Sequence, residues 1–458
     1  MAEPRSIPAR ALAWITWGLT FHILAVAVLF GLFRLPAGVV RGIAAWKEIA
    51  AALLFVAVVA RAVTGRGPRV SVTATDLCVG GWIALTVVYF VTENVVWRDS
   101  IPIKAALFGL RDACYFVLFY FVGRATPEIV RDDRWMKRAF TVLLITSGLA
   151  ILEQIFITPQ MLVVLGVASY VRDFLGTAVY TTNNVYGLPS NYWSQMGSHL
   201  VWRSGSVFLS SQAFAVIFVI LLPQATLWVL ERRDRARAWA NVGYAVIWSG
   251  LLVTYTRAAI AVGVLQLGLI LGARRRVTGI ALAAAMGLGV LIAAMIAVPG
   301  LATFIIDTLT WQTGSSASHV KDWTAGITAF LEQPWGYGLG TADIAAVRGG
   351  LEPIVADNLY LDFAVQTGVL GLALLVATLT FFAATASRLA RTGATTEERE
   401  LGTSVLLSTV GVALYGMTSV MLGDPMVSYL LFWFAGMAVT VAQRAPDAIP
   451  RALRASYA

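Results

Sequence analysis

Runs of about 20 mostly apolar residues recur along nearly the whole of this chain. Each run is long enough to cross the roughly 30 Å hydrocarbon core of a bilayer as one α-helix, which pairs its backbone polar groups internally. Only 13% of the residues are charged, whereas a globular domain carries about 25%. The sequence therefore predicts an all-α polytopic membrane protein that forms a single domain over residues 1–458.

We expect about twelve membrane spans. The first should remain attached to the protein, because the apolar run that follows residues 1–10 lacks the small-residue site at which a signal peptide is cleaved. The predicted spans are 11–33, 45–62, 74–92, 103–123, 138–157, 206–230, 238–256, 258–273, 278–298, 358–387, 401–421 and 425–443.

The basic residues predict the orientation of these spans. Every second connection is rich in arginine, such as 61–69 and 124–138, and so are both chain ends. Basic connections stay on the cytoplasmic side, so both termini are expected inside. The connections 158–205 and 299–357 then face outward, and they are long and rich in Tyr, Trp, Gly, Asn and Ser. Because the inner connections are short and basic, we expect function at the outer face, on loops that contain short amphipathic helices.

Composition argues against several classes of function. A net charge of +9 suits nucleic-acid binding, but the basic residues stand in short clusters between apolar runs, as topology signals do. Cys78 and Cys114 lie inside apolar segments and only three histidines are present, so neither a metal site nor a cofactor is predicted. Asp132 and Asp133 could be mistaken for a metal-binding pair, but arginines flank them and we expect solvated charges.

Arginines near the outer ends of spans are the first candidates for chemistry, because an ionisable side chain within a membrane is costly and usually functional. Arg203 lies where the first outer loop enters a span, Arg257 in a tight outer turn, and Arg348 in the second outer loop. A guanidinium matches two phosphate oxygens at once, so converging arginines suit a diphosphate. Arg257 could instead extend to the lipid headgroups.

Other charges belong to the spans themselves. Lys47 and Glu48 open the second span, and Arg111 with Asp112 occupies the fourth. The last two residues could form an ion pair inside the membrane or serve helix packing.

The second outer loop holds the remaining candidates. Asp357 and Asn358 stand at the start of a span, where the helix dipole favours a carboxylate and where Asp also serves as an N-cap. Tyr360 continues the polar face into the span. His319 begins an amphipathic segment that we expect along the membrane surface. The glycine-rich run 336–340 could cradle a phosphate or form a plain tight turn.

At these residues the chain resembles the O-antigen ligase and Wzy-type O-antigen polymerase family of bacterial inner-membrane glycosyltransferases. The resemblance covers most of the chain and rests on four motifs, on their order and on the membrane side they share. The motifs are Arg203-Ser204-Gly205-Ser206-Val207-Phe208, one residue off the usual Arg-x-Gly-x-Phe; Thr254-Tyr255-Thr256-Arg257; His319-x-x-x-Trp323 followed by Pro334-x-Gly336-x-Gly338-x-Gly340; and Asp357-Asn358-x-Tyr360-Leu361 followed by Gly368-x-x-Gly371.

The resemblance implies a GT-C-like helical fold and a glycan donor carried on a polyprenyl diphosphate such as undecaprenyl diphosphate. It implies an inverting, metal-independent transfer at the periplasmic face of the inner membrane. Arg203 and Arg257 would bind the donor diphosphate, and Asp357 would be the base that deprotonates the acceptor hydroxyl. The secondary substrate-binding residues would be Arg348, His319, Tyr360 and Asn358.

Two kinds of acceptor are compatible with this resemblance. A polymerase adds repeat units of O-antigen or exopolysaccharide to one another, together with a chain-length regulator or an export complex, whereas a ligase transfers the glycan to the lipopolysaccharide core. Ligases usually carry His where this chain has Asp357, and this departure favours the polymerase. The alternative from a different class is a flippase of lipid-linked sugars, which predicts short loops on both faces.

Overall fold

The protein's structure, a computed structural model, describes residues 7–65, 71–92, 101–132, 134–176, 187–196, 199–232, 236–274, 306, 310 and 314–444. These residues form a helical bundle with one short antiparallel β-ribbon, in which Trp193 pairs with Trp202. The predicted helical class is therefore confirmed. Eight helical segments are long and apolar enough to cross a membrane, and the protein is a multi-pass membrane protein.

The elements follow one another along the chain as α1 (Ile7–Ala27), α2 (Ala37–Ala44), α3 (Trp46–Val63), α4 (Ala74–Val91), α5 (Ile103–Cys114), α6 (Leu118–Ala125), α7 (Arg134–Phe156), α8 (Pro159–Val164), α9 (Val167–Ser169), β1 (Trp193–Met196), β2 (His199–Trp202), α10 (Ser211–Glu231), α11 (Ala236–Leu252), α12 (Arg257–Ala273), α15 (Gly314–Glu332), α16 (Asp343–Gly349), α17 (Leu359–Thr392), α18 (Thr396–Tyr415) and α19 (Pro425–Arg444).

The predicted number of twelve spans remains a prediction. The eight candidate spans are Ile7–Leu32, Ala37–Val63, Ala74–Val91, Ile103–Ala125, Arg134–Phe156, Ser211–Glu231, Leu359–Thr392 and Pro425–Arg444. Three further predicted spans fall on α11, α12 and α18, of which α12 is a shorter apolar helix. The predicted span 278–298 lies outside the described residues.

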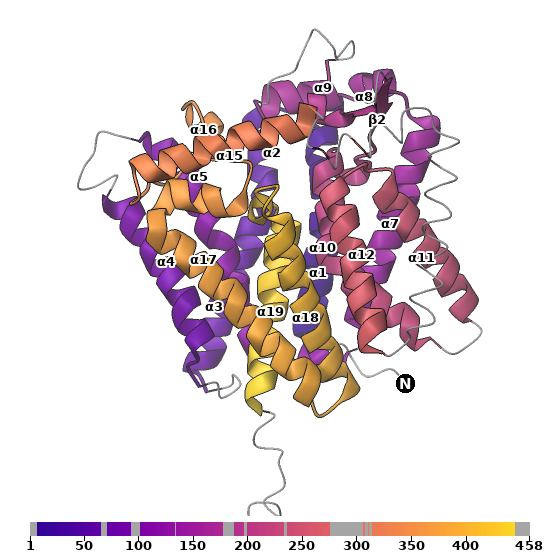
Figure 1. Cartoon of the computed structure of the whole chain (residues 1–458), viewed down its shortest axis with the longest axis vertical. Coiled ribbons are helices and arrows are strands. Elements are labelled where there is room, and N and C mark those ends of the chain that lie inside the picture. Colours follow the sequence, from indigo (N-terminus) through magenta and orange to yellow (C-terminus); the bar gives the residue numbers. More distant parts are fainter. Residues whose placement is uncertain are drawn as a thin grey trace, which may run out of the picture.

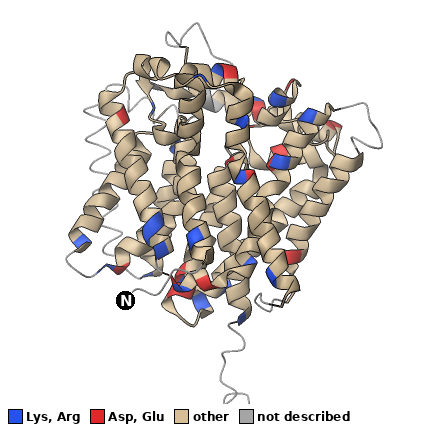
Figure 2. Cartoon of the chain, turned by 180° about the vertical axis from the view of Figure 1, so that it is seen from behind, with Lys and Arg blue, Asp and Glu red and all other residues tan. Residues whose placement is uncertain are grey.

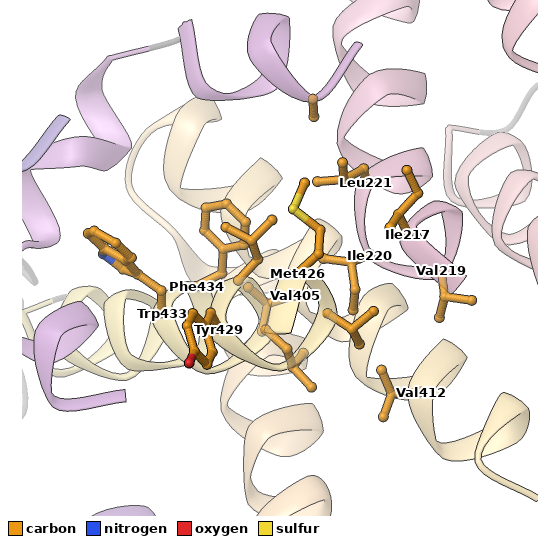
Figure 3. Packing of buried hydrophobic residues seen from close by; sticks show 14 of the residues in the cluster. Ile217, Val219, Ile220, Leu221, Val405, Val412, Met426, Tyr429, Trp433 and Phe434 are labelled. Carbon is orange, nitrogen blue, oxygen red and sulfur yellow. The ribbon is translucent and has the colours of Figure 1, made fainter. Parts of the chain in front are cut away.

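Two helices, α10 and α19, form the centre of the bundle. Both are buried on nearly every side, which explains why their sequences are apolar all round rather than amphipathic. Figure 3 shows the contact between them: Met426 of α19 lies beside Leu221 and Ile220 of α10, and Val405 of α18 packs near the same point. The other helices surround this centre.

The described helices and strands of the two connections predicted to face outward lie at one end of the bundle. Figure 1 shows α15 and α16 lying across that end, with α8, α9 and β2 beside them. We call it the α15 end. Charged residues concentrate towards the two ends of the bundle (Figure 2), as expected when the middle of each helix contacts lipid or other helices.

The opposite end holds a buried polar network that the basic pattern of 124–138 did not predict. Arg124 is one of the arginines that the sequence analysis interpreted as topology signals, and its side chain is only 6% exposed. Its guanidinium donates to both carboxylate oxygens of Asp76, each at 2.9 Å, and to Thr440 Oγ1 at 2.9 Å. Arg124 therefore has a structural role that the sequence analysis did not predict: it joins α6 to α4 and α19. A buried guanidinium needs such partners for its donors.

A kink in α17 fixes the loop that precedes α16. Gly368 has φ 65° and ψ −163°, values that interrupt the helix. The amide of Val369, which would donate to Val365 in a continuous helix, donates instead to Pro334 O at 2.9 Å. The freed carbonyl of Val365 accepts from Tyr337 N at 2.7 Å.

The same loop carries the glycine-rich run 336–340. The amides of Gly338 and Gly340 donate to the carbonyl and the side chain of Gln366, at 3.1 and 2.8 Å. These donors are therefore engaged with α17, and of the two readings of the run the structure supports the tight turn rather than the phosphate cradle. Gly340 has φ 79°, and a Cβ there would lie 2.1 Å from Ala105 O of α5.

Replacing Gly340 by alanine should therefore destabilise the protein by about 2 to 4 kcal/mol, because the new methyl group forces α5 and the loop apart and the left-handed backbone adds strain. The thermal unfolding midpoint of the protein in detergent measures this loss. Gly350→Ala is the matched control, since Gly350 has φ 87° but a Cβ there would meet nothing within 4 Å. Equal losses in the two variants would show that the contact with α5 does not matter.

Candidate active site

Two of the arginine motifs meet at the α15 end. The amide of Ser204 donates to Val253 O at 3.1 Å, which joins the chain after β2 to the turn before α12. The Arg203 guanidinium then donates through Nε to Thr254 O and through Nη2 to Thr256 Oγ1, both at 2.9 Å. Arg257 follows as the first residue of α12. One edge of the Arg203 guanidinium is thus fixed by the second motif.

The two guanidinium groups are close enough to affect each other. The pKa of Arg203 is lowered to about 10, chiefly by burial; Tyr415 opposes this shift, and the nearby charge of Arg257 contributes to it. Arg203 still carries its positive charge at neutral pH. Like charges held together in a partly buried place are unfavourable by themselves, so this arrangement favours an anion between them.

A buried glutamate that the sequence analysis did not select supports the Arg203 turn. Glu153, near the end of α7, is 8% exposed, and its Oε2 accepts from the Ser206 amide at 2.6 Å and from the Ser204 hydroxyl. The Ser206 hydroxyl donates to Thr146 O at 2.7 Å. Glu153 was visible in the sequence as a carboxylate inside a predicted span, which is the signal that could have identified it.

Replacing Glu153 by alanine should destabilise the protein by about 1 to 3 kcal/mol, because the Ser206 amide and the Ser204 hydroxyl are left buried without an acceptor. The unfolding midpoint in detergent measures the change. Glu153→Gln keeps one side-chain oxygen in place and should recover most of the stability. If the alanine variant melts like the wild type, Glu153 does not support this turn.

The third and fourth motifs meet each other through a histidine and an aspartate. His319 lies on α15, and its Nδ1 is 2.8 Å from Oδ2 of Asp357, which immediately precedes the N-cap of α17. The contact is an ion pair when the imidazole is protonated, and its geometry is not that of an aligned hydrogen bond. Loosely aligned contacts are common in active sites without substrate. Asp357 has φ 41°, an uncommon value for a residue with a Cβ.

Electrostatics link this pair to the arginines. The contact with Asp357 raises the pKa of His319 above its ordinary value, burial opposes the shift, and the charge of Arg257 also lowers this pKa. The structure therefore brings four predicted site residues, Arg203, Arg257, His319 and Asp357, to the α15 end of the bundle.

Asn358 and Tyr360 have structural partners instead. Asn358, not Asp357, is the N-cap of α17: its Oδ1 accepts from the amides of Tyr360 and Leu361, and its Nδ2 donates to Met417 O at 2.9 Å. The Tyr360 hydroxyl donates to Ala413 O at 2.7 Å. Both residues hold the start of α17 against the end of α18. The capping role that the sequence offered to Asp357 therefore belongs to its neighbour, which leaves the Asp357 carboxylate with His319.

Arg348 lies with a different set of charges. Burial lowers its pKa, and so does the neighbouring Arg111, while Asp112 and Asp343 oppose the shift. Arg348 belongs to α16, which packs on α5 through closely approaching small residues: a Cβ on Gly349 would lie 2.3 Å from that of Ala105. Arg348 therefore joins the charges of α5 rather than Arg203.

The groups able to act on an anion at this site are arginines. Among the described residues, no three His, Cys, Asp or Glu side chains are grouped so that they could hold a metal ion. The arrangement offers two neighbouring cations, of which Arg203 is fixed by hydrogen bonds, and one carboxylate–imidazole pair.

Comparison with known proteins supports the resemblance found from the motifs. Residues 242–376 match the family model Wzy_C, described as O-antigen ligase. This segment contains Arg257, His319, Arg348 and Asp357, and the expected resemblance to the O-antigen ligase and Wzy-type family is confirmed. No curated protein matches the chain.

Proposed function

We propose, with the O-antigen ligase and Wzy-type family as the premise, that this protein is a glycosyltransferase that polymerises oligosaccharide repeat units carried on undecaprenyl diphosphate. It would act in the bacterial inner membrane with both termini cytoplasmic and the α15 end in the periplasm. The observation that carries the proposal is the meeting of Arg203 and Arg257 with the His319–Asp357 pair. A chain-length regulator or an export complex would be a further partner.

The arginines would bind the donor. In the transfer, the bond between the anomeric carbon and the diphosphate oxygen breaks, and negative charge grows on the departing lipid diphosphate. Arg203 and Arg257 would neutralise this charge, which is worth about 3 to 4 kcal/mol of barrier per donor in comparable sites. Because the diphosphate is already a good leaving group, no protonated acid is needed.

The carboxylate–imidazole pair would act on the acceptor. As the acceptor hydroxyl attacks the anomeric carbon, its proton must pass to a base. Asp357 is the proposed base, and the ion pair with His319 at 2.8 Å orients it. The proton moves from the hydroxyl to the carboxylate, and the new glycosidic bond forms with inversion.

Ligation to the lipopolysaccharide core is the second candidate. It is favoured by the description of the matched family as O-antigen ligase. The polymerase is preferred because the residue at the expected histidine position is Asp357. A flippase of lipid-linked sugars would have no need of a carboxylate–imidazole pair beside two arginines.

Gene deletion separates polymerase from ligase. The lipopolysaccharide ladder and the secreted polysaccharide of the deletion strain are compared on gels, with complementation by the wild type. Loss of long chains, with single repeat units still attached to the core, or loss of secreted polymer alone, is expected for a polymerase. Bare core with polymer accumulating on the lipid carrier would mean a ligase and would overturn the preferred proposal.

A reconstituted assay separates an enzyme from a flippase. Purified protein is mixed with lipid-linked oligosaccharide that is already accessible from both membrane faces, and with lipopolysaccharide core as the acceptor that a ligase needs. An enzyme lengthens or transfers the glycan, and the products differ in mass. An unchanged glycan would overturn both enzymatic proposals.

A further inference from the structure

A second group of charged side chains lies next to the proposed catalytic pair. It consists of Lys47 and Glu48 at the start of α3, Arg111 and Asp112 on α5, Arg348 on α16 and Asp362 on α17, and we call it the α5–α16 cluster. Electrostatic interactions connect its members. Lys47 interacts with the charges of Arg111 and Arg348, and Asp362 interacts with the charge of Asp112.

Part of the cluster is internally paired. Lys47 Nζ lies 3.0 Å from Glu48 Oε1, and Arg111 Nη2 lies 2.6 Å from Asp112 Oδ1. Such pairs are what a purely structural cluster needs, because each charge then has its counter-charge. If pairing were complete, these residues would need no ligand.

Pairing is incomplete at three positions. Glu48 Oε2 and Asp362 Oδ1 are buried, and neither has a hydrogen-bond partner within the described part of the chain. Asp362 as a whole is only 5% exposed, and its other oxygen accepts from Gln366 at 3.0 Å. The half-buried Arg348 guanidinium makes no hydrogen bond or ion pair with any described residue. Two acceptors and one multiple donor are therefore left over.

A ligand that satisfies all three must offer both donors and acceptors. Each unpaired buried polar atom is costly, and the cost disappears when a partner is supplied. The two carboxylate oxygens need O–H or N–H donors, whereas Arg348 needs oxygen acceptors. A sugar ring presents several hydroxyl groups, each of which donates and accepts. Inorganic diphosphate would satisfy Arg348 but would repel the two carboxylates.

The position of the cluster relates it to the acceptor rather than to the donor diphosphate. Asp362 lies on the first turn of α17, five residues after Asp357. Asp343, at the start of α16, is electrostatically close to Arg348 and also to Asp357. His319, which contacts Asp357, also interacts electrostatically with Arg257. Asp357 is therefore linked electrostatically to the arginines through His319 and to the α5–α16 cluster through Asp343.

We propose that Glu48, Asp362 and Arg348 form a binding subsite for the hydroxyl groups of the acceptor glycan, beside the carboxylate that would deprotonate it. This inference rests on the proposed function. The inference extends the proposed function by assigning the acceptor to a subsite of its own. Binding of the acceptor glycan and binding of the donor diphosphate then depend on different residues.

The test uses two soluble probes on the purified full-length protein. One is the oligosaccharide released by mild acid from the lipid-linked repeat unit that accumulates in the deletion strain, and the other is inorganic pyrophosphate. Binding of each is measured by ligand-observed NMR for the wild type, Glu48→Gln, Asp362→Asn, Arg348→Gln and Arg203→Ala. Arg172→Gln is the control, because Arg172 is 63% exposed and paired with Asp173.

The carboxylate variants and the arginine variant are expected to affect different probes. Glu48→Gln and Asp362→Asn should weaken oligosaccharide binding by about ten- to a hundredfold and leave pyrophosphate binding unchanged, because each loses a charged acceptor for a hydroxyl. Arg203→Ala should weaken pyrophosphate binding and leave oligosaccharide binding unchanged. The unfolding midpoint should stay constant or rise in Asp362→Asn, because a buried charge without a counter-charge has been removed.

Three outcomes overturn the inference. They are the absence of oligosaccharide binding to the wild type at millimolar concentration, unchanged oligosaccharide binding in the variants, and lower pyrophosphate affinity in Glu48→Gln or Asp362→Asn. A lower unfolding midpoint in Asp362→Asn would likewise assign this carboxylate to structure alone. Failure of the proposed function looks different: oligosaccharide binding would depend on the cluster as expected, but the wild type would not lengthen or transfer lipid-linked glycan.

Discussion

Replacing Asp357 by asparagine should slow glycan transfer by about a hundred- to ten-thousandfold, the range over which a positioned general base contributes. Asparagine has the same shape but cannot accept a proton. The start of α17 should remain intact, because Asn358 supplies the helix cap. The measurement is the rate of product formation by purified protein with lipid-linked substrate, at equal protein level.

Asp322→Asn is the matched control for this variant. Asp322 lies on α15, three residues after His319, and is electrostatically close to Asp357, but only Asp357 forms the ion pair with the imidazole. Its replacement removes the same charge from the same neighbourhood and should change the rate only a few-fold. If Asp357→Asn keeps the wild-type rate, or if both variants lose activity equally, Asp357 is not the base.

The pair also predicts a dependence of stability on pH. The pKa of His319 is raised in the folded protein, chiefly by the contact with Asp357. Its contribution to stability is therefore fully present below the ordinary histidine pKa of about 6.5 and is lost as pH rises through the raised value. His319→Gln should abolish this part of the pH dependence of the unfolding midpoint.

The second large effect is expected at Arg203. Replacing it by alanine should slow transfer by about a hundred- to a thousandfold, because a fixed cation that faces growing negative charge is lost. Arg203→Lys should recover only part of this, since lysine cannot donate to both Thr254 O and Thr256 Oγ1 as the guanidinium does.

The Arg203 measurement compares rates across donor concentrations with the second substrate held constant. Arg172→Ala serves as control, because it removes an exposed arginine from the same connection, 158–205. A normal rate for Arg203→Ala at equal protein level would contradict the proposed diphosphate site, whatever the behaviour of Asp357→Asn.

Some features of the site could be predicted from the sequence because they depend on residue type and on membrane side. An arginine at the outer end of a span is expensive unless it is used, which identified Arg203 and Arg257. The contact of His319 with Asp357 could not be predicted, because 38 residues separate them and only the packing of α15 on α17 brings them together. The support given by Glu153 was missed for the same reason, since its partners lie on another segment.

The loop glycines show where local pattern misleads. A run of glycines before a helix resembles a phosphate-binding turn, and local sequence cannot distinguish this from close packing. The kink at Gly368 decided the matter, because it freed the Val365 carbonyl for Tyr337, and Gln366 accepts from the amides of Gly338 and Gly340. The same holds for Arg124: its residue type suggested a topology signal, whereas burial against α4 and α19 gave it a structural role.

The sequence by itself determined the helical membrane class, the order of the spans and the predicted side of the two long connections. These follow from hydrophobicity and charge along the chain, since lipid demands apolar, internally hydrogen-bonded segments whatever their neighbours are. Only the tertiary structure decided which charges face one another, because ion pairing and hydrogen bonding depend on distances of a few ångströms between segments far apart in sequence. The His319–Asp357 pair and the unpaired oxygens of Glu48 and Asp362 are of this second kind.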